Sequence, residues 1–247
     1  MGKMDRWLDM TGDEYWDCIT ALRKTAAAQN GTRSTTTTND KPTYRPDAPW
    51  LEVYAPPAYR KATLDNFRSR PGAEKALKAC RQWVDKFGAK TVKGLLLHGP
   101  TGIGKTHLAY GIGHALADKG YWPYFANFVT LCSEIKKTWK NDYLFEGDVK
   151  RPVIQNSIVI LDDVGAELVG RAEQGWVAEL IYEIVRARAE NQRPTVVTSN
   201  LNLDQLGQRY TQRVASRLGE LCRPLWFKAA DYRIRTGDNA DGMPGAQ

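Results

Sequence analysis

Hydrophobic and polar positions follow two different rhythms along the middle of the chain. Short apolar runs predict buried strands, and between them lie longer segments with apolar residues at helical spacing. The predicted strands are 95–97, 122–125, 158–161, 195–198 and 225–227. The predicted helices between them are 105–119, 128–139, 176–188 and 206–218. Buried strands separated by helices predict an α/β fold, with a mostly parallel sheet covered on both faces.

The flanking segments have other patterns. One more amphipathic helix is predicted over 73–87. Near the N-terminus, Thr11 to Glu14 fits a capping box followed by apolar residues at helical spacing, which predicts a short helix. The next stretch is polar and rich in Thr and Pro, as in flexible linkers. The predicted organisation is a helical segment at 1–28, a linker at 29–55, one α/β domain at 56–236 and a disordered tail at 237–247.

Composition places the chain among folded globular proteins. Of its 247 residues, 42% are hydrophobic and 26% are charged, which excludes collagen-like, coiled-coil and wholly disordered chains. No apolar run is long enough to span a membrane, and the first ten residues carry charges where a signal peptide would be apolar. We therefore expect a cytoplasmic protein with no membrane partner. The 4 cysteines stand far apart, so we expect reduced packing residues.

One loop carries a phosphate-binding pattern. The residues that fit GxxxxGKT are Gly99, Pro100, Thr101, Gly102, Ile103, Gly104, Lys105 and Thr106, with His107 directly after them. The glycines let backbone N–H groups converge on phosphate oxygens, and the start of the following helix adds positive potential. Lys105 is expected to reach the terminal phosphates, and the Thr106 hydroxyl is expected to hold Mg²⁺.

Two adjacent acids follow the predicted strand 158–161. Asp162 and Asp163 come at the carboxyl end of this strand, where open α/β sheets bind their ligands. We expect Asp162 to bind Mg²⁺ through water and Asp163 to orient or polarise the attacking water. Paired acids after a strand also occur as solvated turns or helix caps. In a chain with a phosphate loop, the pair favours a role in hydrolysis.

Three further pieces give the chain a family resemblance. The runs GPTGIGKTHLA, ILDDVGAE and PTVVTSN are similar to those of the AAA+ ATPases of the DnaC and DnaI helicase-loader and IstB transposition-helper group. The resemblance covers about residues 56–236. It implies a three-layer P-loop NTPase fold with a parallel sheet in the order 5-1-4-3-2, a minimal lid and a short N-terminal helical appendage. It also implies ATP as the nucleotide and head-to-tail assembly on single-stranded DNA.

The resemblance also implies roles for polar residues beyond the loop. Asn200 corresponds to the sensor of the γ-phosphate, although Ser199-Asn200 also fits a turn or a cap. Arg217, on one helix face with Arg213, corresponds to an arginine finger given to a neighbour's ATP, or else is a surface or DNA-contacting arginine. Arg233 resembles a second sensor, with Arg235 or neither as alternatives. Asn127 fits either a residue that couples DNA contact to Asp163 or a turn.

The expected partners follow from charge and from exposed aromatic residues. The net charge is +7, and Lys136, Lys137, Lys140 and Arg171 fit either contacts with a nucleic-acid backbone or a solvated face. The segment 1–28 carries Trp and Tyr residues suited to docking on a replicative DNA helicase. The expected function is thus an ATPase that loads this helicase on single-stranded DNA.

Three other functions remain open at this point. One is a transposition helper that recruits a transposase to DNA. A P-loop kinase of a small molecule is disfavoured, because the tandem acids, the strand-end Asn and the helix Arg do not belong to a kinase pocket. A scaffold that binds ATP and hardly hydrolyses it is the last alternative.

Overall fold

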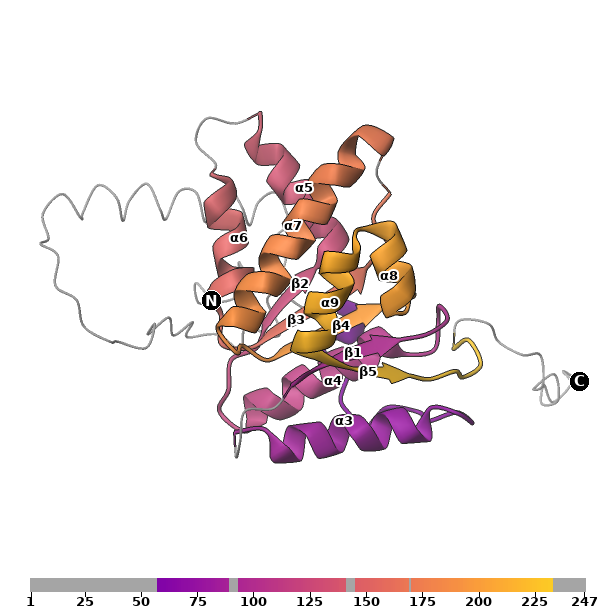
Figure 1. Cartoon of the computed structure of the whole chain (residues 1–247). Helices are drawn as coiled ribbons and strands as arrows, with labels where there is room; N and C mark the ends of the chain where they lie inside the picture. The colour runs from indigo at the N-terminus through magenta and orange to yellow at the C-terminus, as the bar shows by residue number, and fades with distance from the viewer. Residues whose placement is uncertain (1–56, 89–92, 141–144, 169, 233–247) are drawn as a thin grey trace, which may run out of the picture. The chain divides into compact units, whose positions relative to one another are not determined.

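The computed structural model describes residues 57–88, 93–140, 145–168 and 170–232 (Figure 1). The predicted segments at 1–28 and 29–55 and the predicted tail at 237–247 lie outside these ranges. The strands are β1 (Gly94–His98), β2 (Tyr124–Asn127), β3 (Val159–Val164), β4 (Thr195–Ser199) and β5 (Cys222–Trp226). The helices are η1 (Pro57–Tyr59), α3 (Glu74–Lys86), α4 (Lys105–Asp118), α5 (Phe128–Thr138), α6 (Glu146–Gln155), α7 (Arg171–Glu190), α8 (Leu203–Arg209) and α9 (Gln212–Leu221).

The strands form one parallel sheet in the order β2-β3-β4-β1-β5. Read from the other edge, this is the predicted order 5-1-4-3-2, which is confirmed. Because β1 and β3 lie on either side of β4, the loop after β1 and the acids after β3 reach the same edge of the sheet. This is the carboxyl edge, at which parallel sheets place their ligands.

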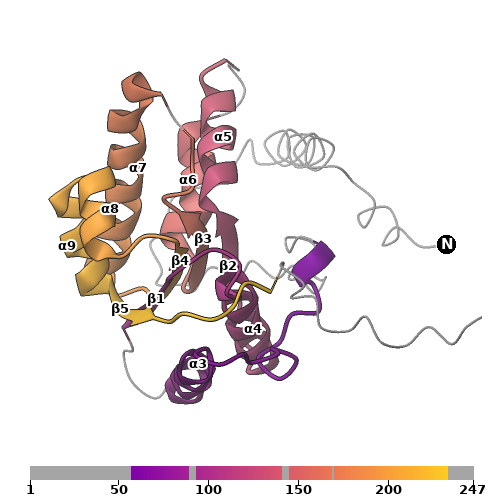
Figure 2. The same ribbon diagram turned by 90° about the vertical axis from the view of Figure 1, so that its right-hand side faces the viewer.

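Helices cover both faces of the sheet, as predicted. Helices α3 and α4 lie on one face, and α5 to α9 lie on the other (Figures 1 and 2). Side chains alternate along each strand, so Leu96, Leu161 and Val197 point into the larger core, with the apolar residues of α5, α6, α7 and α9. On the other face, Gly113 of α4 allows close approach to Phe125 and Ile160. The result is the predicted three-layer architecture.

The structure corrects three details of the predicted elements. Strand β5 starts at Cys222 and is an edge strand on which Arg223, Pro224 and Trp226 are exposed, so it is not a buried strand. An edge strand pairs on one side only, which also explains why it tolerates proline. The predicted helix 206–218 is two helices, because Thr211 caps the start of α9 by accepting a hydrogen bond from the Val214 N–H. Helix α6 was not predicted, and it contains Pro152, a residue type that disfavours the interior of a helix.

A buried arginine connects three segments at the opposite, amino edge of the sheet. Arg188 of α7 has no exposed surface. Its guanidinium donates to Thr195 Oγ1 (2.7 Å) in β4 and to the carbonyls of Val153, Asn156 and Pro194 (each 2.9 Å). Burial lowers the pKa of Arg188. Arg188 is therefore a packing residue.

Replacing Arg188 is expected to destabilise the fold strongly. Arg188→Met keeps the apolar stem but leaves several buried oxygens without donors, and each unsatisfied group costs about 1–3 kcal/mol. We expect the free energy of unfolding to fall by at least about 3 kcal/mol in urea denaturation. The control is Arg186→Met on the same helix, where the exposed ion pair with Glu190 (2.7 Å) contributes little to stability because solvent screens it. Equal stability losses in the two variants would contradict this role.

The cysteines of the described ranges are packing residues, as predicted. Cys80, Cys132 and Cys222 are buried and free. Burial raises the pKa of each of these thiols to about 12, so they stay protonated and unreactive. In this part of the chain, no helix has the length and apolar character that a membrane crossing requires.

Candidate nucleotide site

The loop between β1 and α4 has the backbone geometry of a phosphate cradle. Gly99, Gly102 and Gly104 have φ angles of 150°, 78° and 90°, in the range that favours glycine. A Cβ atom at Gly104 would lie 2.6 Å from the Phe67 ring, so this position also needs glycine for space. The N-cap of helix α4 is Gly104, which has no side chain that could cap the helix. Its first N–H groups are therefore suited to bind an anion.

Lys105 lies inside this loop, with 6% of its surface exposed. Its Nζ donates to the carbonyls of Gly99 (2.9 Å) and Pro100 (2.7 Å) and to Asn200 Oδ1 (2.8 Å). The predicted phosphate lysine and the predicted γ-phosphate sensor are thus direct neighbours, although they are 95 residues apart in the sequence. A phosphate entering the loop would take the place of weaker carbonyl contacts to Lys105.

The predicted Mg²⁺ residues also meet. Thr106 Oγ1 donates to Asp162 Oδ1 at 3.1 Å, and Thr198 Oγ1 donates to the same oxygen at 2.6 Å. Burial, together with the neighbouring carboxylate of Asp163, raises the pKa of Asp162 to about 6 against the lowering effect of the two hydroxyls. A bound cation would favour the ionised form of this carboxyl.

This donor set fits Mg²⁺. The described residues contain no group of three or more His, Cys, Asp or Glu side chains that could enclose a metal. Mg²⁺ prefers one or two protein oxygens, with water and substrate phosphates completing its octahedron. A hydroxyl and a carboxylate beside a phosphate loop supply that number.

Asp163 points to another neighbour. Its φ of 58° turns the chain sharply after Asp162, and its N–H donates to Thr198 Oγ1 at 2.9 Å. Asn127 Nδ2 at the end of β2 donates to Asp163 Oδ2 at 3.4 Å. Asn127 also caps α5, since its Oδ1 accepts from the Thr130 N–H at 3.1 Å. Both readings of Asn127 therefore have a contact that supports them.

The segment after β5 crosses the phosphate loop. The Tyr232 N–H donates to the Gly102 carbonyl at 3.0 Å. The Tyr232 ring packs against Phe67, with 5.8 Å between centroids, and beneath the Arg70 guanidinium at 4.4 Å. Arg233 and Arg235 lie outside the described residues, so the second sensor stays a prediction.

His107 contacts the segment before α3. Its Nε2 lies 3.0 Å from both the Thr63 carbonyl and Asn66 Oδ1. Nearby, the Tyr59 ring stacks on Tyr110 of α4, with 5.1 Å between centroids. These contacts hold residues 57–66 against α4, beside the loop. The role of His107 in nucleotide binding therefore stays a prediction.

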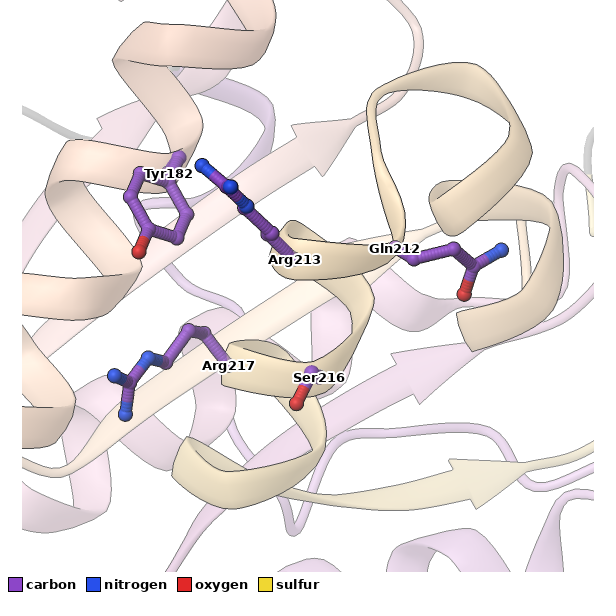
Figure 3. A pocket seen from close by; sticks show the side chains of 5 residues that line it. All are labelled: Tyr182, Gln212, Arg213, Ser216 and Arg217. Carbon is purple, nitrogen blue, oxygen red and sulfur yellow. The ribbon is translucent and has the colours of Figure 1, made fainter.

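The two helix arginines line a separate pocket. Its lining residues are Tyr182, Gln212, Arg213, Ser216 and Arg217. Figure 3 shows Arg213 and Arg217 extending from α9 toward Tyr182 of α7, while Gln212 points to the other side. Arg217 donates to Glu220 Oε2 at 2.7 Å, and this hydrogen bond raises the pKa of Arg217. No residue of the phosphate loop lines this pocket, and the role of Arg217 as an arginine finger stays a prediction.

The predicted DNA-contacting lysines are partly engaged within the chain. Lys136 Nζ lies 2.7 Å from Glu173 Oε2, and Lys137 Nζ lies 3.0 Å from Glu134 Oε1. Lys140 is exposed. Lys136 and Lys137 therefore fit the solvated-face interpretation better than the sequence suggested.

The Thr198 hydroxyl belongs to the site, although no motif in the sequence marks it. This hydroxyl contacts the side chain of Asp162 and the N–H of Asp163, and so fixes both acids. The available signal was a polar residue near the end of an otherwise apolar strand, next to the strand that carries the acids. Such a residue is recognised only when the neighbouring strand is known.

A sheet in this order, with a phosphate loop after β1 and tandem acids after β3, defines an AAA+ P-loop ATP-binding protein. Residues 66–239 match the family described as IstB-like ATP binding protein, and the chain belongs to this family. The predicted resemblance is thereby confirmed.

Relatives of the chain bear two kinds of name. The replicative helicase loader DnaC of Escherichia coli (strain K12) is 26% identical over 182 residues, which are 72% of each chain. DnaI of Bacillus subtilis (strain 168), also named a replicative helicase loader, is 31% identical over 60% of this chain and 47% of its own. A Mycobacterium tuberculosis protein named for ATP binding in an insertion sequence is 30% identical over 53% of this chain and 47% of its own.

Solved structures agree with the fold. The crystal structure of the DnaC helicase loader superposes with a TM-score of 0.61 at 28% identity, covering 70% of this chain and all of that one (100%). DnaA bound to AMPPCP and single-stranded DNA superposes with a TM-score of 0.58 over 71% of this chain and 51% of its own. At 18% identity, the latter supports the fold alone.

Proposed function

We propose that this chain binds and hydrolyses ATP with Mg²⁺ and loads a replicative DNA helicase onto single-stranded DNA. The observation that carries the ATPase proposal is the meeting of residues from three segments at one sheet edge. Lys105 contacts Asn200, and Thr106 contacts Asp162. Sequence similarity to a helicase loader over 72% of the chain supports a replicative helicase as the partner.

Each residue of the site has a separate role in the proposed hydrolysis of ATP. The loop 99–106 would hold the phosphates through its N–H groups and Lys105, while Thr106 and Asp162 would hold Mg²⁺, which neutralises phosphate charge. Asp163 would polarise the attacking water, and Asn200 would contact the γ-phosphate. Arg217 would reach the ATP of a neighbouring subunit in a head-to-tail assembly, because it lines a pocket apart from its own loop.

The proposed role of Asp163 gives a direct test. Asp163→Asn keeps the size of the side chain but removes its ability to accept a proton. We expect ATP binding to be kept and turnover to fall at least about 100-fold, the usual minimum for a lost general base. The measurement is nucleotide affinity and phosphate release, with and without single-stranded DNA. Unchanged turnover would contradict the assignment, and stimulation by DNA is expected in the wild type only.

The proposed helicase partner is tested by a capture experiment with the full chain. We propose that residues 1–28 dock on the helicase, so Trp16→Ala should weaken retention of a hexameric replicative helicase without changing ATP affinity. The matched control is Trp226→Ala, which removes an exposed tryptophan from the ATPase domain. Equal retention by wild type and Trp16→Ala would contradict docking through this segment.

A second candidate is a transposition helper that recruits a transposase to DNA. The family description and the insertion-sequence relative favour it. Both candidate functions use the same ATPase site and differ in the partner protein, a helicase or a transposase. Capture of a transposase together with double-stranded DNA, and no capture of a helicase, would select this alternative.

A further inference from the structure

Glu167 is a buried carboxylate that the proposed hydrolysis does not use. Its side chain is 2% exposed. Oε2 accepts from the Gly165 N–H at 3.1 Å, and Oε1 accepts from Arg209 Nε at 2.9 Å and from the Tyr210 hydroxyl at 2.7 Å. Arg209 also donates to the main-chain carbonyl of Glu167. The carboxylate thus joins its own turn to the end of α8.

The first end of this connection is the turn after β3. Asp163 and Gly165 have φ angles of 58° and 92°, so two residues of the turn are left-handed. The Ala166 N–H closes the turn by donating to the Asp163 carbonyl at 3.1 Å. The bond from Gly165 to Glu167 is a second constraint on the same turn. The placement of Asp163 therefore depends on a turn that Glu167 holds.

The second end of this connection is the start of α9, the helix that carries Arg213 and Arg217. Arg209 is the last residue of α8, and Tyr210 follows it as the C-cap. Only Thr211, the N-cap of α9, separates Tyr210 from this helix. Arg213 and Arg217 lie on the first two turns of α9 and point into the pocket in Figure 3. A shift of Tyr210 would therefore move the backbone of α9 that carries both arginines.

Burial makes this connection stiff. The Tyr210 ring packs edge-on against Phe128, with 6.4 Å between centroids, and Phe128 directly follows Asn127, which contacts Asp163. A buried carboxylate keeps its partners, because an unpaired buried charge is strongly unfavourable. Glu167, Arg209 and Tyr210 are thus expected to move as one body.

We propose that Glu167 is a positioning residue that transmits movement of the Asp163 turn to α9, and so sets the placement of Arg213 and Arg217. This inference rests on the proposed binding of ATP at the loop. In a head-to-tail assembly, it links the nucleotide in one subunit to the arginines that this subunit offers to the next. A contact that only stabilised the fold would transmit nothing.

Amide hydrogen exchange of the full chain, with and without Mg-ATP, tests the inference. In the wild type, we expect nucleotide to slow exchange in the loop 99–106, in the turn 163–167 and in the segment 211–221. In Glu167→Gln, the loop should keep its response, while segment 211–221 should lose most of it. The reason is that the amide keeps the shape of the side chain but loses the charge that holds Arg209.

Tyr210→Phe is the second variant. It keeps the ring on Phe128 and removes one hydroxyl, so we expect segment 211–221 to lose at least half of its nucleotide-dependent protection. Should Glu167→Gln fail to fold, this variant alone decides. Glu173→Gln is the matched control, since it neutralises a carboxylate of α7 that is ion-paired with Lys136 of α5 and is not part of the turn 163–167, and it should behave as the wild type.

Two results would overturn the inference, and they are distinguishable from failure of the proposed function. The first is a response in segment 211–221 that is the same in the wild type and in both variants. The second is no response there in the wild type while the loop 99–106 responds. Absence of any response in the loop itself would instead remove ATP binding, and the transmission with it.

Discussion

Arg217→Ala is expected to lose turnover by about 10³–10⁵-fold, the range measured for arginine fingers, while the affinity for ATP stays that of the wild type. The physical reason is that, in the proposed head-to-tail assembly, the guanidinium would neutralise charge that develops only in the transition state at the ATP of a neighbouring subunit. The side chain lines a pocket that contains no residue of its own phosphate loop. The measurement is phosphate release across a range of protein concentrations.

Mixing variants separates a finger given to a neighbour from one that acts within its own chain. Arg217→Ala subunits keep an intact loop, and Lys105→Ala subunits keep an intact Arg217. A mixture should therefore recover part of the wild-type turnover, although neither variant is active alone. Arg151→Ala, which removes an exposed arginine on α6, should match the wild type. Equal turnover in the wild type and Arg217→Ala would end the assignment.

Lys105→Ala is expected to lose nucleotide binding and with it all turnover. Truncating one partner of a buried, charged hydrogen-bonded pair costs about 2–5 kcal/mol, which is a loss of about 30-fold to several thousand-fold in affinity. Lys105 meets these conditions because it is 6% exposed and already bonded to oxygens of the loop. The measurement is calorimetric titration with Mg-ATP.

The control for Lys105 must separate lost binding from lost folding. Lys119→Ala removes a lysine at the other end of α4, where Nζ donates to the Val84 carbonyl at 2.7 Å. It is expected to keep the affinity of the wild type even if it lowers the melting temperature. Wild-type affinity in Lys105→Ala would refute the phosphate site. A Lys105→Ala protein that no longer melts cooperatively would mean that the lysine supports the loop itself.

Local pattern was sufficient where the chemistry depends on neighbours in the sequence. The run from Gly99 to Thr106 predicted a phosphate loop, because left-handed glycines, a lysine and a hydroxyl are needed there in a fixed order. Apolar runs predicted the strands of the sheet, since a strand covered on both faces has no polar side. The strand order came from the resemblance, not from the pattern.

Local pattern was insufficient where burial depends on distant segments. Arg188 resembles the other arginines of its region in sequence, yet it is fully buried and bonded to oxygens from residues 153–156 and 194–195. Strand β5, which contains Pro224, is partly exposed because it lies at an edge of the sheet. Only its pairing with β1 shows this position. Lys136 of α5 is paired with Glu173 of α7, and only the tertiary structure shows this ion pair.

By itself, the sequence determined the class of fold, the phosphate loop and the tandem acids, because each depends on residues within a few positions of one another. The tertiary structure decided which distant side chains meet. In the folded chain, Asn200 contacts Lys105 and Thr198 contacts Asp162. Glu167 contacts Tyr210, directly before the start of α9. These contacts arise from the parallel order of the strands, which carries residues far apart in the chain to one edge of the sheet.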